Sequence, residues 1–257
     1  MDLPAVPLDA WQSFLVCLVR ILAVVGSMPV FGTGQGPVRL RVGLAFMLAV
    51  LMFPVVEPHL PGGGLSFLAL GVILLQETVF GVIMGFTARL ILMSIQFGGT
   101  VVGYKMGFAK ANVMDHSQQQ VPLMGQFMNV VAVLVFLSVD GHHVFIRGLA
   151  KSYEILPPGT ADFSGEAIPY VMSMTGDMFV LGLQLISPML IVLTLNYFGL
   201  GIMARLMPQM NVLMLSWPVN QALGFVFLGL SLNMIVFLLG EEFQALGERF
   251  MQLLQMM

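Results

Sequence analysis

The sequence predicts an all-α integral membrane protein, because it is rich in long apolar runs, poor in charge and without strand-like alternation. Of its 257 residues, 58% are hydrophobic and 9% are charged. A soluble domain carries about 25% charged residues. The surroundings of this chain are therefore mostly lipid or other apolar helices, and the missing period-two pattern disfavours a β-barrel.

Charge and cysteine content narrow the function classes further. The net charge is −3, so no basic field points to nucleic acid. Cys17 lies inside an apolar run and is expected to be a small core residue. The first residues lack Lys and Arg, so we expect no cleaved secretory signal.

The first three apolar runs cover residues 11–31, 42–56 and 65–97. Gly and Pro in stretches 32–37 and 58–64 separate them. A helical span needs about 20 residues. The second run is therefore short for a span, and the third is too long for one upright crossing. The third run must tilt, break or leave the membrane.

The last three apolar runs cover residues 121–139, 178–203 and 212–239. Pro188 and Pro218 lie inside the last two runs and predict kinks. The longest polar region, 147–169, precedes them. A short amphipathic tail, 241–257, follows, with apolar residues at helical spacing. These are Phe243, Leu246, Phe250 and Leu253.

Taken as ordinary spans, the six runs sort the basic residues onto two sides of the membrane. One side carries Arg39, Arg41, Lys105, Lys110 and Arg205. The other side carries Arg147, Lys151 and Arg249. The positive-inside rule then places the first group in the cytoplasm and both termini outside.

Two glycine pairs predict close helix packing. Gly81 with Gly85, and Gly99 with Gly103, are each four residues apart and therefore share one helix face. Small residues there let another backbone approach closely, which stabilises helix contacts in lipid. The partner is a helix of the same chain or of another chain, and the pattern leaves both open.

Four charged residues lie within or beside apolar runs: Arg20, Glu77, Arg89 and Asp177. A lone charge at mid-membrane costs roughly 3 kcal/mol or more, so these residues must pair, reach the interface or face water. Glu77 with Arg20 or with Arg89 is a plausible pair. A structural ion pair, or residues in a wet channel, is favoured over a proton relay.

Asp140, His142 and His143 are metal-ligand types. We expect a loop and helix start there and no metal, because adjacent histidines on one element converge poorly on a single ion. No nucleotide-binding, metalloprotease or nucleophile motif is present. The sequence therefore predicts neither an enzyme nor a cofactor.

An ordered set of segments resembles the FliR family, the R subunit of the flagellar type III export gate. The set includes Val19-Arg20-Ile21, Leu75-Gln76-Glu77, Gln96-Phe97-Gly98-Gly99, Gly103-Tyr104-Lys105-Met106-Gly107-Phe108-Ala109, Pro122-Leu123-Met124-Gly125-Gln126, Asp140-Gly141-His142-His143, Ser152-Tyr153, Pro208-Gln209-Met210-Asn211-Val212 and Trp217-Pro218. The resemblance covers nearly the whole chain. It departs at Asp115, which precedes His116 where the family often has proline.

The resemblance implies a pore-forming structural subunit in the bacterial inner membrane, at the flagellar basal body. It implies assembly with FliP-like and FliQ-like subunits into a helical hetero-oligomer of long kinked helices and hairpins. FlhA-like and FlhB-like components and unfolded export substrates are the further partners. Residues 1–174 are then a P-like portion, and 175–257 a Q-like helical hairpin with its tail. Export use in flagella is favoured over use in an injectisome.

The same resemblance assigns a plug loop to the polar stretch that follows the third run. Its residues are Met106, Gly107, Phe108, Ala109, Lys110, Ala111, Asn112, Val113, Met114, Asp115, His116, Ser117, Gln118, Gln119, Gln120, Val121 and Pro122. By residue type alone, this stretch is a plain solvated loop or a re-entrant plug. The alternative function for the whole chain is a small-molecule secondary transporter with broken helices, which predicts internal repeat symmetry. We find no convincing repeat.

Overall fold

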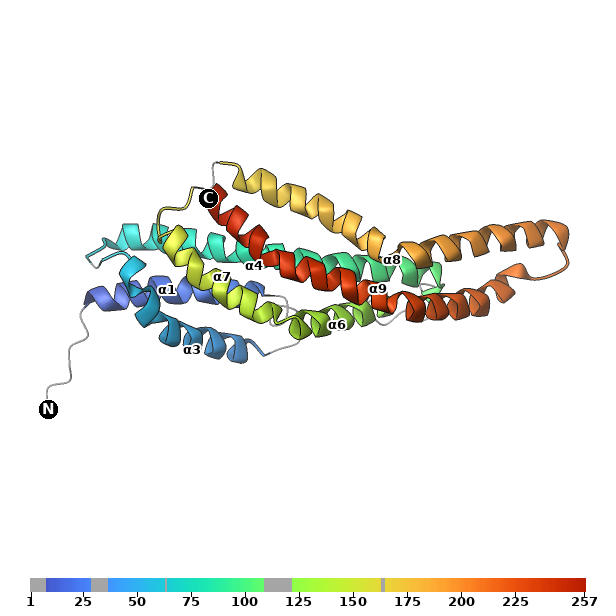
Figure 1. Ribbon diagram of the computed structural model, residues 1–257, viewed down its shortest axis with the longest axis horizontal. Coiled ribbons are helices and arrows are strands. Elements are labelled where there is room, and N and C mark those ends of the chain that lie inside the picture. Colours follow the sequence, from blue (N-terminus) through green and yellow to red (C-terminus); the bar gives the residue numbers. More distant parts are fainter. Residues whose placement is uncertain (1–7, 29–36, 63, 109–121, 163–164) are drawn as a thin grey trace. The chain divides into compact units, whose positions relative to one another are not determined.

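The computed structural model describes residues 8–28, 37–62, 64–108, 122–162 and 165–257, and their regular structure is helical throughout (Figure 1). The elements are α1 (Leu8–Ser27), α3 (Val38–Val56), the 3₁₀ turn η1 (Glu57–His59), α4 (Phe67–Lys105), α6 (Leu123–Ser138), α7 (Gly141–Ile155), α8 (Ala167–Leu206) and α9 (Val212–Met256). The predicted all-α class is confirmed.

The third apolar run forms one unbroken helix. Helix α4 has 39 residues and continues past the apolar run to Lys105. At about 1.5 Å per residue it is roughly 58 Å long, about twice the hydrocarbon thickness of a bilayer. Of the three outcomes expected for this run, a break is therefore wrong. The second run is also longer than expected, because α3 begins at Val38, after Pro37.

The fourth run is shorter than a span. Helix α6 has 16 residues, and α7 follows it across a bend of 64°. Within the described residues, five helices are each long and apolar enough to cross a membrane, and the bent pair α6 and α7 makes a sixth crossing if it is one span. The polar region expected from residue 147 onwards begins inside α7, so its first part is helical. The direction of each crossing stays a prediction.

The C-terminal tail is the last part of α9. Helix α9 runs for 45 residues through Pro218 to Met256, so the predicted tail belongs to the same helix as the sixth apolar run. The helical spacing of the tail is confirmed, because its four apolar residues are buried. They are Phe243, Leu246, Phe250 and Leu253. Helix α8 likewise continues through Pro188 for 40 residues.

The chain forms two compact units. Unit 1 contains residues 1–90, 140–175 and 243–257, and unit 2 contains residues 91–139 and 176–242. Helices α4, α8 and α9 each contribute residues to both units. The two units are thus discontinuous in sequence, whereas the predicted P-like and Q-like parts are each one continuous stretch of the chain. The division into P-like and Q-like parts stays a prediction.

In unit 1, α3 packs along α1 (Figure 1). Phe14 on α1 meets the ring edges of Phe46 and Phe53 on α3, with centroids 5.9 and 5.6 Å away. In the same unit, the rings of Phe145 on α7 and Phe250 on α9 lie 4.9 Å apart. Aromatic pairs in this edge-to-face geometry add to the stability that area burial provides.

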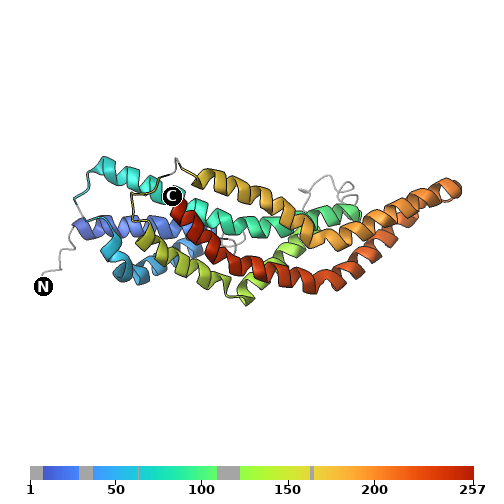
Figure 2. The ribbon, with the colours of Figure 1, turned by 45° about the horizontal axis from the view of Figure 1, so that its top comes forward.

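Unit 2 contains a helical hairpin, formed by α8 from residue 176 and α9 up to residue 242, with its turn at residues 207–211 (Figure 2). Inside it, the Asn196 amide donates a hydrogen bond of 2.6 Å to Oδ1 of the buried Asn220. The α4 part of this unit packs backbone to backbone on α8, because a Cβ at Gly98 would lie 2.7 Å from the Gly182 carbonyl oxygen.

Candidate functional site

A buried ion pair joins α1 to α4. The guanidinium of Arg20 donates from Nε to Oε2 of Glu77 and from Nη2 to Oε1, the second bond measuring 3.0 Å. The two side chains are each 1% exposed. A guanidinium can make this bidentate contact because its planar fork of N–H donors matches a carboxylate. Of the two pairings that the sequence left open, the structure forms the one with Arg20.

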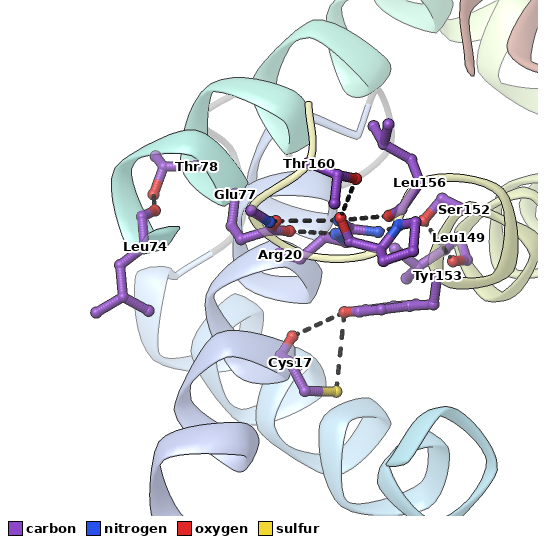
Figure 3. A network of polar contacts seen from close by, with 12 residues as sticks. Cys17, Arg20, Leu74, Glu77, Thr78, Leu149, Ser152, Tyr153, Leu156 and Thr160 are labelled. Carbon is purple, nitrogen blue, oxygen red and sulfur yellow. Dashed lines mark hydrogen bonds and ion pairs between the residues drawn. The ribbon is translucent and has the colours of Figure 1, made fainter. Parts of the chain in front are cut away.

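Two further segments complete the network around Arg20 (Figure 3). Nη1 donates 3.2 Å to the hydroxyl of Ser152 on α7, and Nη2 donates 3.1 Å to the Leu156 carbonyl. The backbone N–H of Gly159 donates 3.3 Å to Glu77 Oε1. The ion pair therefore connects α1, α4, α7 and the segment that follows α7, all within unit 1.

Aromatic rings enclose the same guanidinium. The ring of Phe80 on α4 lies 4.6 Å from its central carbon, and the ring of Tyr153 on α7 lies 4.4 Å from it. The Tyr153 hydroxyl donates 3.0 Å to the Cys17 carbonyl on α1. Cation–π contact partly replaces the water that a buried cation loses. Cys17 is fully buried, as expected for a small core residue.

The role of this network is to stabilise the packing of the helices. Removing one partner of a buried pair costs about 3–5 kcal/mol, because the other charge is then left uncompensated. Here Arg20 and Glu77 are bonded to each other, to a hydroxyl and to backbone groups. We therefore interpret the pair as the connector of four chain segments, in line with the structural reading favoured by the sequence.

The other two charges of the apolar runs lie on the surface. Arg89 on α4 and Asp177 on α8 are exposed. Among the residues that the structure describes, neither takes part in an ion pair. Their place at the surface of the chain fits interfacial water or a partner subunit better than an internal relay.

The first glycine pair lies against α1. A Cβ at Gly81 would lie 2.6 Å from the Ala23 Cβ and 3.0 Å from the Arg20 carbonyl oxygen. A Cβ at Gly85 would collide with Ser27, whose hydroxyl donates to the Gly81 carbonyl at 3.1 Å. These glycines let α1 and α4 approach closely, and the same approach brings Arg20 to Glu77.

The second glycine pair lies against α6. A Cβ at Gly99 would lie 2.9 Å from the Met124 carbonyl oxygen and 3.0 Å from the Gly125 Cα. A Cβ at Gly103 would lie 3.0 Å from the Met124 Cβ. In the structure both glycine pairs therefore meet helices of the same chain.

The expected plug loop falls largely outside the described residues, because 109–121 are not described. Its first residues are held on the hairpin of unit 2. Met106 is buried with its Sδ 2.6 Å from where a Cβ of Gly224 would lie. Gly107 has φ +89°, a left-handed conformation that favours glycine, and a Cβ there would lie 2.9 Å from the Trp217 ring. The Tyr197 hydroxyl donates 2.8 Å to the Lys105 carbonyl.

Sequence reasoning did not assign roles to several residues of these two sites. They are Phe80, Ser152, Tyr153, Tyr197, Trp217 and Gly224. The Ser152-Tyr153 pair was noted only as part of a resemblance. A buried Arg needs more hydrogen-bond acceptors than one carboxylate offers. A hydroxyl-bearing residue beside an apolar helix face, such as Ser152, was therefore the sequence signal that could have indicated a further partner of Arg20.

Asp140, His142 and His143 lie at the start of α7, as predicted. Asp140 precedes the helix with φ 55° and ψ 32°, and its side chain makes no capping hydrogen bond. The two imidazole centroids are 4.2 Å apart, and one ligand atom from each of the three residues lies within 4.8 Å of the others. The sequence predicted no metal here because adjacent histidines converge poorly on one ion, and that expectation stays a prediction.

The fold and its buried charge network define the chain as an all-α integral membrane protein in which a buried, hydrogen-bonded ion pair joins α1 to α4. The sequence pattern of the family described as bacterial export proteins, family 1, matches residues 11–246. The chain belongs to this family, the FliR family, and is a component of the flagellar export apparatus.

Three relatives illustrate the match. The flagellar biosynthetic protein FliR of Bacillus subtilis is 30% identical over 253 residues, which are 96% of each chain. FliR of Pectobacterium carotovorum is 31% identical, over 88% of this chain and 86% of its own. FliR of Escherichia coli is 28% identical, over 84% of both chains.

Proposed function

We propose that this chain is a pore-forming structural subunit of the flagellar type III protein export gate in the bacterial inner membrane. The observation that carries the proposal is the extent of the family match, which runs from residue 11 to residue 246. Among the described residues, the match therefore covers most or all of each helix that is long and apolar enough to cross a membrane. The chain itself catalyses nothing in this proposal.

The partners we propose are FliP-like and FliQ-like subunits, with FlhA-like and FlhB-like components beside them. Large apolar side chains along both arms of the unit 2 hairpin support contact with other subunits or with lipid, because they are exposed. They include Leu195, Phe198, Ile202, Phe225, Leu230 and Phe237. In this proposal, residues 175–257 are the Q-like part and residues 1–174 the P-like part.

We also propose residues 106–122 as the plug of the closed pore. The contacts at the start of this stretch support it. Met106 and Gly107 are packed on Gly224 and Trp217, so the chain enters the stretch from a fixed point. A short polar segment that leaves a fixed point can occupy a wet lumen and move aside without disrupting a packed core. Unfolded export substrates would then pass through the same lumen.

Co-expression with FliP-like and FliQ-like proteins of the same genome tests the assembly. We expect native mass measurement of the purified material to show this chain in a hetero-oligomer with both. An unrelated membrane protein carrying the same tag is the control for incidental association. A chain that stays monomeric beside well-expressed partners would contradict the proposal.

Replacement of residues 109–121 by a short Gly-Ser linker tests the plug. We expect the assembled gate to leak small ions, because the lumen loses its occupant while the anchored Met106 and Gly107 remain. A Gly-Ser replacement of unchanged length separates loss of volume from loss of specific side chains. Unchanged ion permeability of cells that contain the intact assembly would defeat the plug assignment and leave the subunit assignment standing.

A further inference from the structure

The start of α7 carries three side chains whose roles the export function does not explain. Asp140 takes the residue position that normally caps a helix, but its carboxylate caps no backbone N–H. Its backbone lies in the left-handed region, and it is the one non-glycine residue there among those that the structure describes. The carboxylate instead approaches His143, with Oδ1 3.4 Å from Nδ1. This conformation costs an L-residue free energy and keeps the carboxylate beside the imidazoles.

The separations of these groups suit a small cation. A tetrahedral ion with bonds of about 2.1 Å places neighbouring ligand atoms roughly 3.4 Å apart. The Asp140–His143 pair already has this separation. The ligand atoms of the three residues all lie within 4.8 Å of one another, so a small side-chain rotation would bring them to bonding distance of one ion. Asp140 and His143 are exposed and free to make that rotation.

His142 supplies the third group. Its Nδ1 is buried, and no hydrogen bond to it is formed within the described structure. Its ring lies 4.2 Å from that of His143, with 38° between the ring planes. Imidazole nitrogens bind a cation along lone pairs in the ring plane, so an ion shared by the two histidines would sit at the edges of their rings.

The ligand types select the kind of metal. Two imidazoles and one carboxylate suit borderline divalent ions such as Zn²⁺, and are a poor set for Ca²⁺ or Mg²⁺, which prefer oxygen. The N-terminal end of α7 carries a partial positive charge that opposes a cation. The Asp140 carboxylate offsets that charge, which gives it a role that Asn could not fill.

We propose that Asp140, His142 and His143 form a site for one Zn²⁺-like divalent cation, with its remaining position open to water. Three protein ligands and a water are the usual set of an exposed zinc site. This inference is independent of the proposed pore function, because it rests on the geometry of the α7 start alone.

Metal titration of the full chain in detergent tests the site. The chain is purified with a histidine-free tag, stripped with a chelator and titrated with Zn²⁺ against a chromophoric competitor. We expect one Zn²⁺ per chain, and a loss of affinity of at least about tenfold in His143→Asn and in Asp140→Asn. Substitution of Co²⁺ for Zn²⁺ should give the visible absorption of a tetrahedral site.

Two further variants keep the test decisive. His143→Cys retains a zinc ligand, so it should retain binding and add a thiolate-to-Co²⁺ absorption band. His59→Asn removes a histidine elsewhere in the chain and should leave both stoichiometry and affinity unchanged. No binding at millimolar Zn²⁺, or equal binding by the parent and His143→Asn, would overturn the proposal.

Discussion

The two units of the chain hold their helices together in different ways. Unit 1 contains a charged centre, in which Arg20 bonds to Glu77 and to the chain around Ser152 and Leu156. Unit 2 is held by close backbone contact at Gly98 and Gly182 and by a neutral amide pair, Asn196 with Asn220. In lipid there is no hydrophobic force between helices, so packing and polar bonds must supply the specificity.

The two kinds of helix contact depend to different degrees on single residues. A charged centre concentrates the free energy of many contacts on two side chains, and either one alone is strongly destabilising. Backbone contact distributes the free energy along a helix face, and the glycines only make the approach possible. Substitutions at the charged centre, at a glycine contact and at the amide pair should therefore differ in cost, in that order.

Glu77→Leu should have the largest effect, a loss of about 3–5 kcal/mol, because Arg20 then remains buried without a counter-charge. The change in thermal unfolding of the purified chain in detergent measures it. The double variant Arg20→Met with Glu77→Leu should recover much of the loss, since no charge is left buried. A double variant no more stable than the single one would show that the ion pair itself stabilises unit 1.

Gly182→Val should cost about 1–3 kcal/mol, the usual range for overpacking. A Cβ at Gly182 would lie 2.6 Å from the Ser94 carbonyl oxygen, and a backbone atom cannot move aside as a side chain can. Gly199→Val on the same helix is the control, because nothing lies within 4 Å of a Cβ there. Equal melting temperatures of the two variants would show that close backbone contact does not stabilise unit 2.

The amide pair should contribute least, with a coupling free energy of about 0.6 kcal/mol and at most about 1.7, as for other polar bonds between helices in lipid. A double-mutant cycle with Asn196→Leu and Asn220→Leu measures it. A coupling as large as that of Arg20 with Glu77 would erase the contrast between the two units.

Much of the fold followed from the sequence, because apolar runs and helical spacing are local properties. The tail illustrates this, since Phe243 and Phe250 occupy the buried face that their spacing indicated. The continuity of α4 and α9 did not follow, because hydropathy marks where a run meets water and not where a helix ends. The polar residues after Gln96 and after Leu239 continue the helices without interruption.

The site could be predicted only in part. The sequence required Glu77 to have a partner, but Arg20 and Arg89 satisfied that requirement equally. The choice depends on the approach of α1 to α4 at Gly81, which is a tertiary contact. The left-handed backbone conformation of Asp140 could not be predicted from the sequence either, because Asp is common at helix starts with ordinary backbone conformations.

The ion pair has a consequence for the order in which the chain is made. Arg20 precedes Glu77 by 57 residues and Ser152 by 132. At synthesis rates of about 5–20 residues per second, Arg20 leaves the ribosome roughly 3–11 s before its counter-charge. During that interval α1 carries an unmatched cation that opposes entry into the bilayer by about 3 kcal/mol. The counter-charge of Arg20 is therefore made only with α4, and until then the Arg20 guanidinium must reach interfacial water or another acceptor.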